Sequence, residues 1–84
     1  MMNLLSLRPA HPEDAQALHA LAIIDSALPL TGDRIVAQLG DAVVAAISLT
    51  DGRVIADPFR PSADVVEILR LRARQARRAG PVLA

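Results

Sequence analysis

The segment RIVAQLGDAVVAAISLTDGRVIADPF, residues 34–59, decides the fold of this chain. It carries two hairpin signals, because Gly40–Asp41 is a two-residue turn sequence and Gly52, in TDGR, is free to adopt a positive φ. The segment therefore predicts three antiparallel strands, at about residues 34–39, 42–49 and 53–57. The middle strand is almost continuously apolar, which is typical of a central strand covered on both faces. Its two neighbours are more polar, and we expect them to be peripheral.

A short strand is predicted ahead of this meander, in LLSLRPA, residues 4–10. Leu5 and Leu7 alternate with Ser6 and Arg8, so the two leucines share one face of the strand and the polar residues share the other. Pro9 ends the strand because it has no N–H to donate.

A helix follows in HPEDAQALHALAIIDSAL, residues 11–28. His11 stands at the N-cap, Pro12 in the first turn, and Glu13 and Asp14 near the positive end of the helix dipole. The predicted buried stripe comprises Ala15, Leu18, Leu21 and Ala22. His19 lies off this stripe, which indicates a surface residue, and Pro29 and Gly32 end the helical region.

The last helix is predicted from Ser62 to about Ala79, where Gly80–Pro81 ends it. Its apolar face comprises Val65, Val66, Ile68, Leu69, Ala73 and Ala76. Arg72 falls inside that face and Leu71 lies on the polar side. The element order is thus β-α-β-β-β-α. It predicts one α+β domain over residues 4–79, with a curved antiparallel sheet and helices on its faces, and a short tail at 80–84.

Composition limits the functions open to this chain of 84 residues. It has no cysteine and only two histidines, so disulfides are excluded and no metal site is expected. Nine arginines balance nine carboxylates, and this zero net charge favours no nucleic-acid partner. The start of the chain lacks a positively charged signal region, and its longest uncharged apolar run, AVVAAISL, is too short to span a bilayer. We expect a cytoplasmic protein without membrane contact.

The order of the predicted elements, with LRPAHPEDAQALHAL at the start, resembles the amino-terminal half of the GNAT acetyltransferase superfamily. Members commonly begin with a strand ending in Ile/Leu-Arg-x-Ala and continue into a helix that opens near an Asp. Residues 7–10 and Asp14 occupy those places, and the hairpins of residues 33–59 resemble the meander that follows. The resemblance covers residues 4–79. It implies a curved antiparallel sheet with helices on both faces, and acyl-CoA bound beside the fourth strand.

In that family the pyrophosphate of the cofactor lies on backbone N–H groups of an Arg/Gln-x-x-Gly-x-Gly/Ala loop. Here RPSADV, residues 60–65, occupies that place but contains no glycine. Arg60, Ser62 and Ala63 are the residues that could still bind acetyl-CoA. Ser62 as a helix cap and Asp64 as a complement to the helix dipole explain the same stretch without a cofactor. Because Pro61 cannot donate and Asp64 would repel a phosphate, we expect neither a cofactor nor a cofactor-binding residue.

Catalysis is not expected, and no residue is assigned to it. The chain has no tyrosine, whereas many GNAT members use a tyrosine from later elements as a general acid, and those elements have no counterpart here. His11, Glu13 and Asp14 could relay protons, but capping and dipole interactions account for them more simply. An N-acetyltransferase or acyl-CoA binder whose cleft is completed by dimerisation stays open as the alternative.

Self-association is the interaction that the sequence favours. Phe59 is the only aromatic residue, so the core is built from aliphatic side chains, many of them small, and its margin of stability is thin. We expect a homodimer joined through the strand near Val54–Ala56, through the helix carrying Leu71 and Arg72, or through both. The chain is then a small interaction or regulatory module. The five arginines in residues 70–78 leave nucleic-acid binding as a third possibility.

Overall fold

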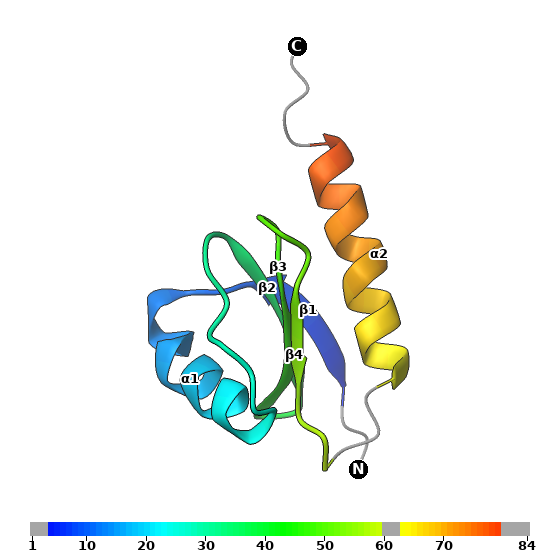
Figure 1. Cartoon of the computed structure of the whole chain (residues 1–84). Coiled ribbons are helices and arrows are strands. Elements are labelled where there is room, and N and C mark those ends of the chain that lie inside the picture. Colours follow the sequence, from blue (N-terminus) through cyan, green and yellow to red (C-terminus); the bar gives the residue numbers. More distant parts are fainter. Residues whose placement is uncertain (1–3, 60–62, 80–84) are drawn as a thin grey trace.

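The computed structural model describes residues 4–59 and 63–79 (Figure 1). Its elements are β1 (Leu5–Pro9), the 3-10 turn η1 (Pro12–Asp14), α1 (Ala15–Ile24), β2 (Arg34–Leu39), β3 (Ala42–Ser48), β4 (Val54–Ala56) and α2 (Ala63–Ala79). The predicted α+β class and the β-α-β-β-β-α order are confirmed. The predicted tail at 80–84 lies outside the described residues.

The four strands form one open antiparallel sheet in the order β1-β2-β3-β4. β3 is central and covered on both faces, as its apolar sequence predicts. The expectation that both of its neighbours are peripheral is wrong for β2. β1 pairs along its whole length with β2, from Leu5 opposite Leu39 to Pro9 opposite Ile35, and makes β2 an inner strand. The polar residues of β2, Arg34 and Gln38, are typical of a peripheral strand, but the pairing with β1 places β2 inside the sheet.

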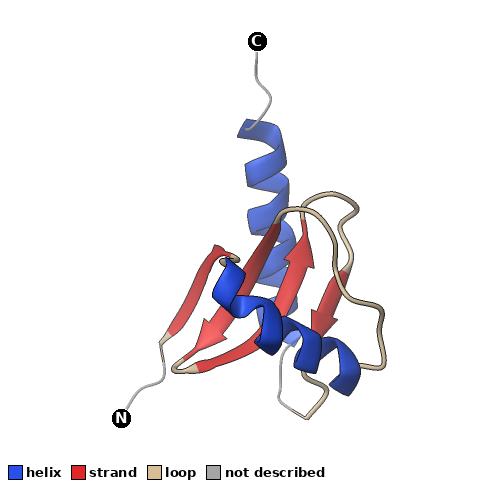
Figure 2. Ribbon diagram, turned by 90° about the vertical axis from the view of Figure 1, so that its left-hand side faces the viewer, coloured by secondary structure: helices blue, strands red, loops and turns tan. Residues whose placement is uncertain are grey.

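The strand register assigns each side chain to one of two faces, and a helix covers each face (Figure 2). Arg8, Val36, Ala46 and Ile55 are aligned across the four strands and lie on the α1 face. Their neighbours along the strands, such as Ile35 and Ile47, lie on the α2 face, because successive side chains of a strand alternate. The sheet is thus the middle layer between α1 and α2.

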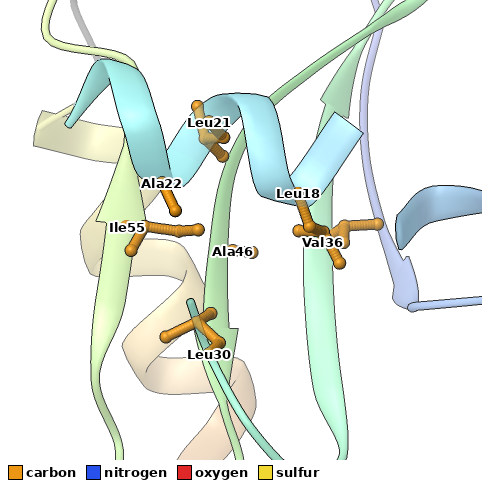
Figure 3. Packing of buried hydrophobic residues seen from close by; sticks show 7 residues of the cluster. All are labelled: Leu18, Leu21, Ala22, Leu30, Val36, Ala46 and Ile55. Carbon is orange, nitrogen blue, oxygen red and sulfur yellow. The ribbon is translucent and has the colours of Figure 1, made fainter. Parts of the chain in front are cut away.

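On the α1 face, Leu18, Leu21 and Ala22 of the helix pack against the sheet residues Val36, Ala46 and Ile55 (Figure 3). Leu30, from the loop after α1, joins this cluster. The prediction that Ala15 opens the buried stripe is wrong, since Ala15 is exposed and Asp14 is buried in its place. The stripe is therefore Asp14, Leu18, Leu21 and Ala22.

On the α2 face, Leu69 and Ala73 are buried against a cluster from β2 and β3 that comprises Ile35, Ala37, Val44, Ala45 and Ile47. Val65 is half-buried beside them, as its place in the predicted apolar face requires. Ile68 does not follow that prediction. It is 42% exposed, because it lies about 100° around the helix from Leu69, on the flank that turns away from the sheet.

The loop between α1 and β2 is held against the end of β3 by Ser48, which is fully buried. Its Oγ donates to the carbonyl of Thr31 at 2.9 Å and accepts from the N–H of Thr50 at 3.1 Å. Gly32 sits at this contact with a φ of +73°, and a Cβ there would overlap Thr50 Oγ1. The junction therefore requires glycine for both conformation and space.

We predict that Gly32→Ala lowers the free energy of unfolding by about 2 kcal/mol, through left-handed backbone strain plus the clash. Gly52→Ala is the matched control. Gly52 has a similar φ of +77°, but the nearest atom to an added Cβ is Arg77 Nη1, at 3.8 Å. Gly52→Ala should lower the free energy of unfolding by only about 1 kcal/mol, through the backbone strain alone. Urea unfolding followed by circular dichroism measures both, and equal losses would contradict the steric argument.

Candidate functional site

The most highly organised polar group in the described residues joins β1, β2 and the start of α1. The guanidinium of Arg8 binds the carboxylate of Asp14 in a bidentate pair, with Nη1–Oδ2 at 2.7 Å and Nη2–Oδ1 at 2.9 Å. The same guanidinium donates from Nε and Nη2 to Gln38 Oε1, at 3.1 and 2.9 Å. Asp14 Oδ2 also accepts from the backbone N–H of His11 at 2.7 Å.

These contacts fix the protonation state of Asp14. The hydrogen bonds from Arg8 and from the backbone of His11 hold the pKa of the Asp14 carboxyl far below its ordinary value, against the opposing effect of burial. The carboxylate therefore stays ionised at neutral pH and has no proton to donate. His11 and Glu13 are exposed beside it. The arrangement suits a structural clamp between strand and helix, and we assign it no catalytic step.

The candidate pyrophosphate loop falls partly outside the described residues, which exclude Arg60 and Ser62. Ala63 is the first residue of α2 and is exposed. Asp64 lies in the first turn of α2, as the sequence predicts, and places a negative charge at the helix end that would have to receive a phosphate.

The edge of β4 is covered by the segment that follows α1. Asp25 Oδ2 accepts from the backbone N–H of Ala56 at 3.1 Å. Arg53 Nη2 donates to the carbonyls of Leu28 and Pro29, at 3.1 and 2.8 Å. A second strand could pair with β4 only by displacing these contacts. The strand near Val54–Ala56 is therefore a poor route to a dimer.

The side of α2 that faces away from the sheet is the second candidate site (Figure 1). We define the outer surface of α2 by the six residues that line a shallow depression there, Asp64, Glu67, Ile68, Arg70, Leu71 and Arg74. Leu71 is 50% exposed, and with Ile68 it forms the apolar centre of this surface. The polar-side position that the sequence predicts for Leu71 is confirmed.

Charge is distributed unevenly along the outer surface of α2. Asp64 and Glu67 precede the apolar centre, while Arg70 and Arg74 flank or follow it. None of these four side chains takes part in a hydrogen bond or an ion pair within residues 4–59 and 63–79. The surface thus has an acidic end, an apolar centre and a basic end, and its charges have no partner in the described fold.

Other kinds of site find no support in the described part of the chain. No group of three or more His, Asp or Glu residues there could hold a metal ion. No described helix is long and apolar enough to cross a membrane. No protein-family model, no curated protein and no solved structure matches this sequence.

We predict that Asp14→Asn lowers the free energy of unfolding at pH 7 by about 2 kcal/mol, because it breaks a bidentate ion pair whose carboxylate is buried and whose guanidinium is partly exposed. Since folding lowers the pKa of Asp14, the stability that it contributes is fully present above the pKa of an unfolded aspartate, about 3.9, and is lost as the pH falls below that value.

The pH dependence of unfolding, followed by circular dichroism in urea, checks this assignment. The native chain should lose stability on acidification more steeply than the Asp14→Asn variant. Asp41→Asn is the control, because Asp41 is exposed and has no hydrogen bond or ion pair among the described residues. Parallel acid profiles for the native chain and Asp14→Asn would refute the role of the clamp.

Proposed function

We propose that this chain is a small non-catalytic interaction module that acts as a homodimer, joined through the outer surface of α2. The observation that carries the proposal is the charge order of that surface, acidic before the apolar centre and basic after it. A helix with this order is complementary to a second copy of itself running in the opposite direction.

The pairing follows from the helical period. With Ile68 and Leu71 at the a and d positions of a heptad, Glu67 and Arg74 both fall at g positions. A two-fold axis midway between Ile68 and Leu71 places Ile68 opposite the partner's Leu71. On the g flank of this interface the partner's nearest charged residue to Glu67 is then Arg74, offset by two residues, about 3 Å, along the helix. Each copy then contributes its apolar pair to the centre, and two charge pairs flank it.

A parallel arrangement of the same helices is less favourable. It would bring the acidic ends together and the basic ends together, and like charges at close range repel. The charge order of the outer surface therefore favours the antiparallel arrangement over the parallel one.

A second exposed apolar patch lies at the end of α1 and in the loop after it, where Ile23, Ile24 and Leu28 are 64%, 43% and 74% exposed. It has more exposed apolar side chains than the outer surface of α2. It lacks the opposed charges that would match it to a copy of itself. We therefore base self-association on α2 and use the α1 patch as the control.

Descent from, or likeness to, half of a GNAT domain is part of the proposal. The observed element order and the antiparallel sheet with helices on both faces agree with what that resemblance implies. The alternative function is acyl-CoA binding or N-acetyl transfer in a cleft completed by dimerisation, with Arg60, Ser62 and Ala63 at the pyrophosphate. Stabilisation by acetyl-CoA in a thermal melt followed by circular dichroism would favour it. Nucleic-acid binding through residues 70–78 would instead show steeply salt-dependent affinity.

We predict that Leu71→Asp weakens dimerisation by about 2 kcal/mol, roughly 30-fold in the dissociation constant, because each dimer loses two central apolar contacts. Sedimentation equilibrium at micromolar concentrations measures the constant. Because Leu71 is half exposed and contacts no core cluster, the variant should keep the fold, which its circular dichroism spectrum checks.

Ile23→Asp is the matched control, since it places the same charge on the other exposed patch. It should leave the dimer intact. A dimer that survives Leu71→Asp but dissociates with Ile23→Asp would move the interface to α1. A native chain that is monomeric throughout would reject the proposal.

A further inference from the structure

The two edges of the sheet differ. At β4, Asp25 and Arg53 bind across the edge and cover it. β1 is the other edge strand, and Figure 2 shows it outermost in the sheet, with no strand of the described chain paired on its outer side. An uncovered edge presents unpaired N–H and C=O groups and is a template for pairing with another chain. The sheet can therefore be extended at β1.

The register shows which backbone groups of β1 are free. The N–H of Ala10 donates to the carbonyl of Arg34 at 2.9 Å, and the carbonyl of Leu4 accepts from the turn after β2 at 3.2 Å. Residues that bond inward and outward alternate along an antiparallel strand, so the even-numbered residues of β1 bond to β2. The N–H and C=O groups of Leu5 and Leu7 therefore point to the open edge, and they have no partner in the described fold.

The open stretch of this edge ends at Pro9. Pro9 has no N–H, and its carbonyl accepts from Arg8 Nη1 at 3.3 Å. Proline and charged side chains commonly block pairing on edge strands. The groups that an incoming strand can bond are thus confined to Leu5 and Leu7.

A cleft of about 490 Å³ lies beside Leu7, between the sheet and α2. The side chains of Arg8 and Arg34 border it but turn to the α1 face, because both residues align with Val36 or alternate in step with it. Asp33 and Arg72 remain on the cleft side, with one charge of each sign. The cleft therefore suits an uncharged apolar side chain. Its apolar lining comprises Leu7, Pro9, Ala10, Ile35, Leu49 and Ala76.

We infer that β1 and this cleft together bind an extended peptide segment of another protein, which adds to the sheet as a fifth strand antiparallel to β1. The peptide residue that exchanges both hydrogen bonds with Leu7 has its side chain on the same face as Leu7, and so enters the cleft. The residue two positions along pairs with Leu5 in the same way. The recognised pattern is apolar, any residue, apolar, because main-chain bonds give affinity and the cleft gives specificity. The inference goes beyond the proposed function and does not depend on the dimer, since the outer surface of α2 faces away from the sheet.

Backbone amide NMR shifts, measured in a titration with the peptide acetyl-Thr-Leu-Thr-Leu-Thr-amide, test the inference. We expect saturable shifts at Leu5 and Leu7 of the edge and at Ile35 and Ala76 of the cleft. The N–H groups of Leu5 and Leu7 should exchange freely with solvent in the native chain alone and become protected in the complex.

Three modified peptides separate the backbone bonds from the cleft. N-methylation of both leucine nitrogens removes the donors to β1 and should weaken binding at least about tenfold. N-methylation of the second and third threonine nitrogens adds the same number of methyl groups on the side away from β1, and should leave the dissociation constant almost unchanged. Threonine in place of both leucines removes the side chain for the cleft and should also cost at least about tenfold.

Leu5→Pro removes one outward N–H and no bond to β2, so it should weaken the original peptide about fivefold more than Leu5→Ala does. Leu5→Ala is the matched control, because it loses the same exposed side chain and keeps the N–H. A thermal melt followed by circular dichroism checks that both variants fold. Should Leu5→Pro unfold, the two N-methylated peptides still decide the question on the native chain.

Several results would overturn the inference. They are an absence of saturable shifts, equal binding of the two N-methylated peptides, equal binding of the all-threonine peptide, or equal effects of Leu5→Pro and Leu5→Ala when both fold. Amides of Leu5 and Leu7 that are already protected without peptide, increasingly so at higher protein concentration, would also overturn it and would assign the edge to a second copy of this chain.

Discussion

The bidentate ion pair between Arg8 and Asp14 fixes how η1 and α1 are placed against the sheet. Arg8 lies on the edge strand, and Gln38, which binds the same guanidinium, lies on the neighbouring strand. Asp14 heads the buried stripe of α1, one turn before Leu18. Asp14 also ties down the backbone of His11, where the chain enters the helix. The pair therefore sets the position from which Leu18, Leu21 and Ala22 reach the sheet.

Much of this fold is predictable from sequence because its signals are local. The hairpin turns at Gly40–Asp41 and Gly52 and the apolar run of β3 define the meander, and the helical periodicity defines α1 and α2. The errors concern contacts between elements. Asp14 reads as a dipole complement in one helix, and its ion pair with Arg8, six residues earlier, depends on how the chain turns from β1 into η1. Asp14 lies four residues before Leu18. This helical spacing is the one sequence signal that could have identified Asp14, instead of Ala15, as the first residue of the buried stripe.

The features of the candidate sites also divide into those that follow from the sequence and those that depend on contacts between elements. The exposed position of Leu71 follows from the helix pattern, because an apolar residue opposite the buried face has no core to join. The closed edge of β4 does not follow from sequence, since it depends on Asp25 and Arg53 meeting partners that are distant in the chain. Arg72 is conspicuous in the sequence as a charge within an apolar face, and the structure places it at the exposed rim of that face.

We propose that α2 meets a second copy of itself in the antiparallel direction, and charge reversal across the proposed contact tests this dimer most directly. Glu67→Arg and Arg74→Glu should each weaken the dimer, about tenfold, because each turns two attractions into repulsions. The double variant restores opposite charges across an antiparallel interface and should recover the native dissociation constant in sedimentation equilibrium. The antiparallel dimer would be contradicted if the double variant lost as much dimerisation free energy as the two single variants together, or more.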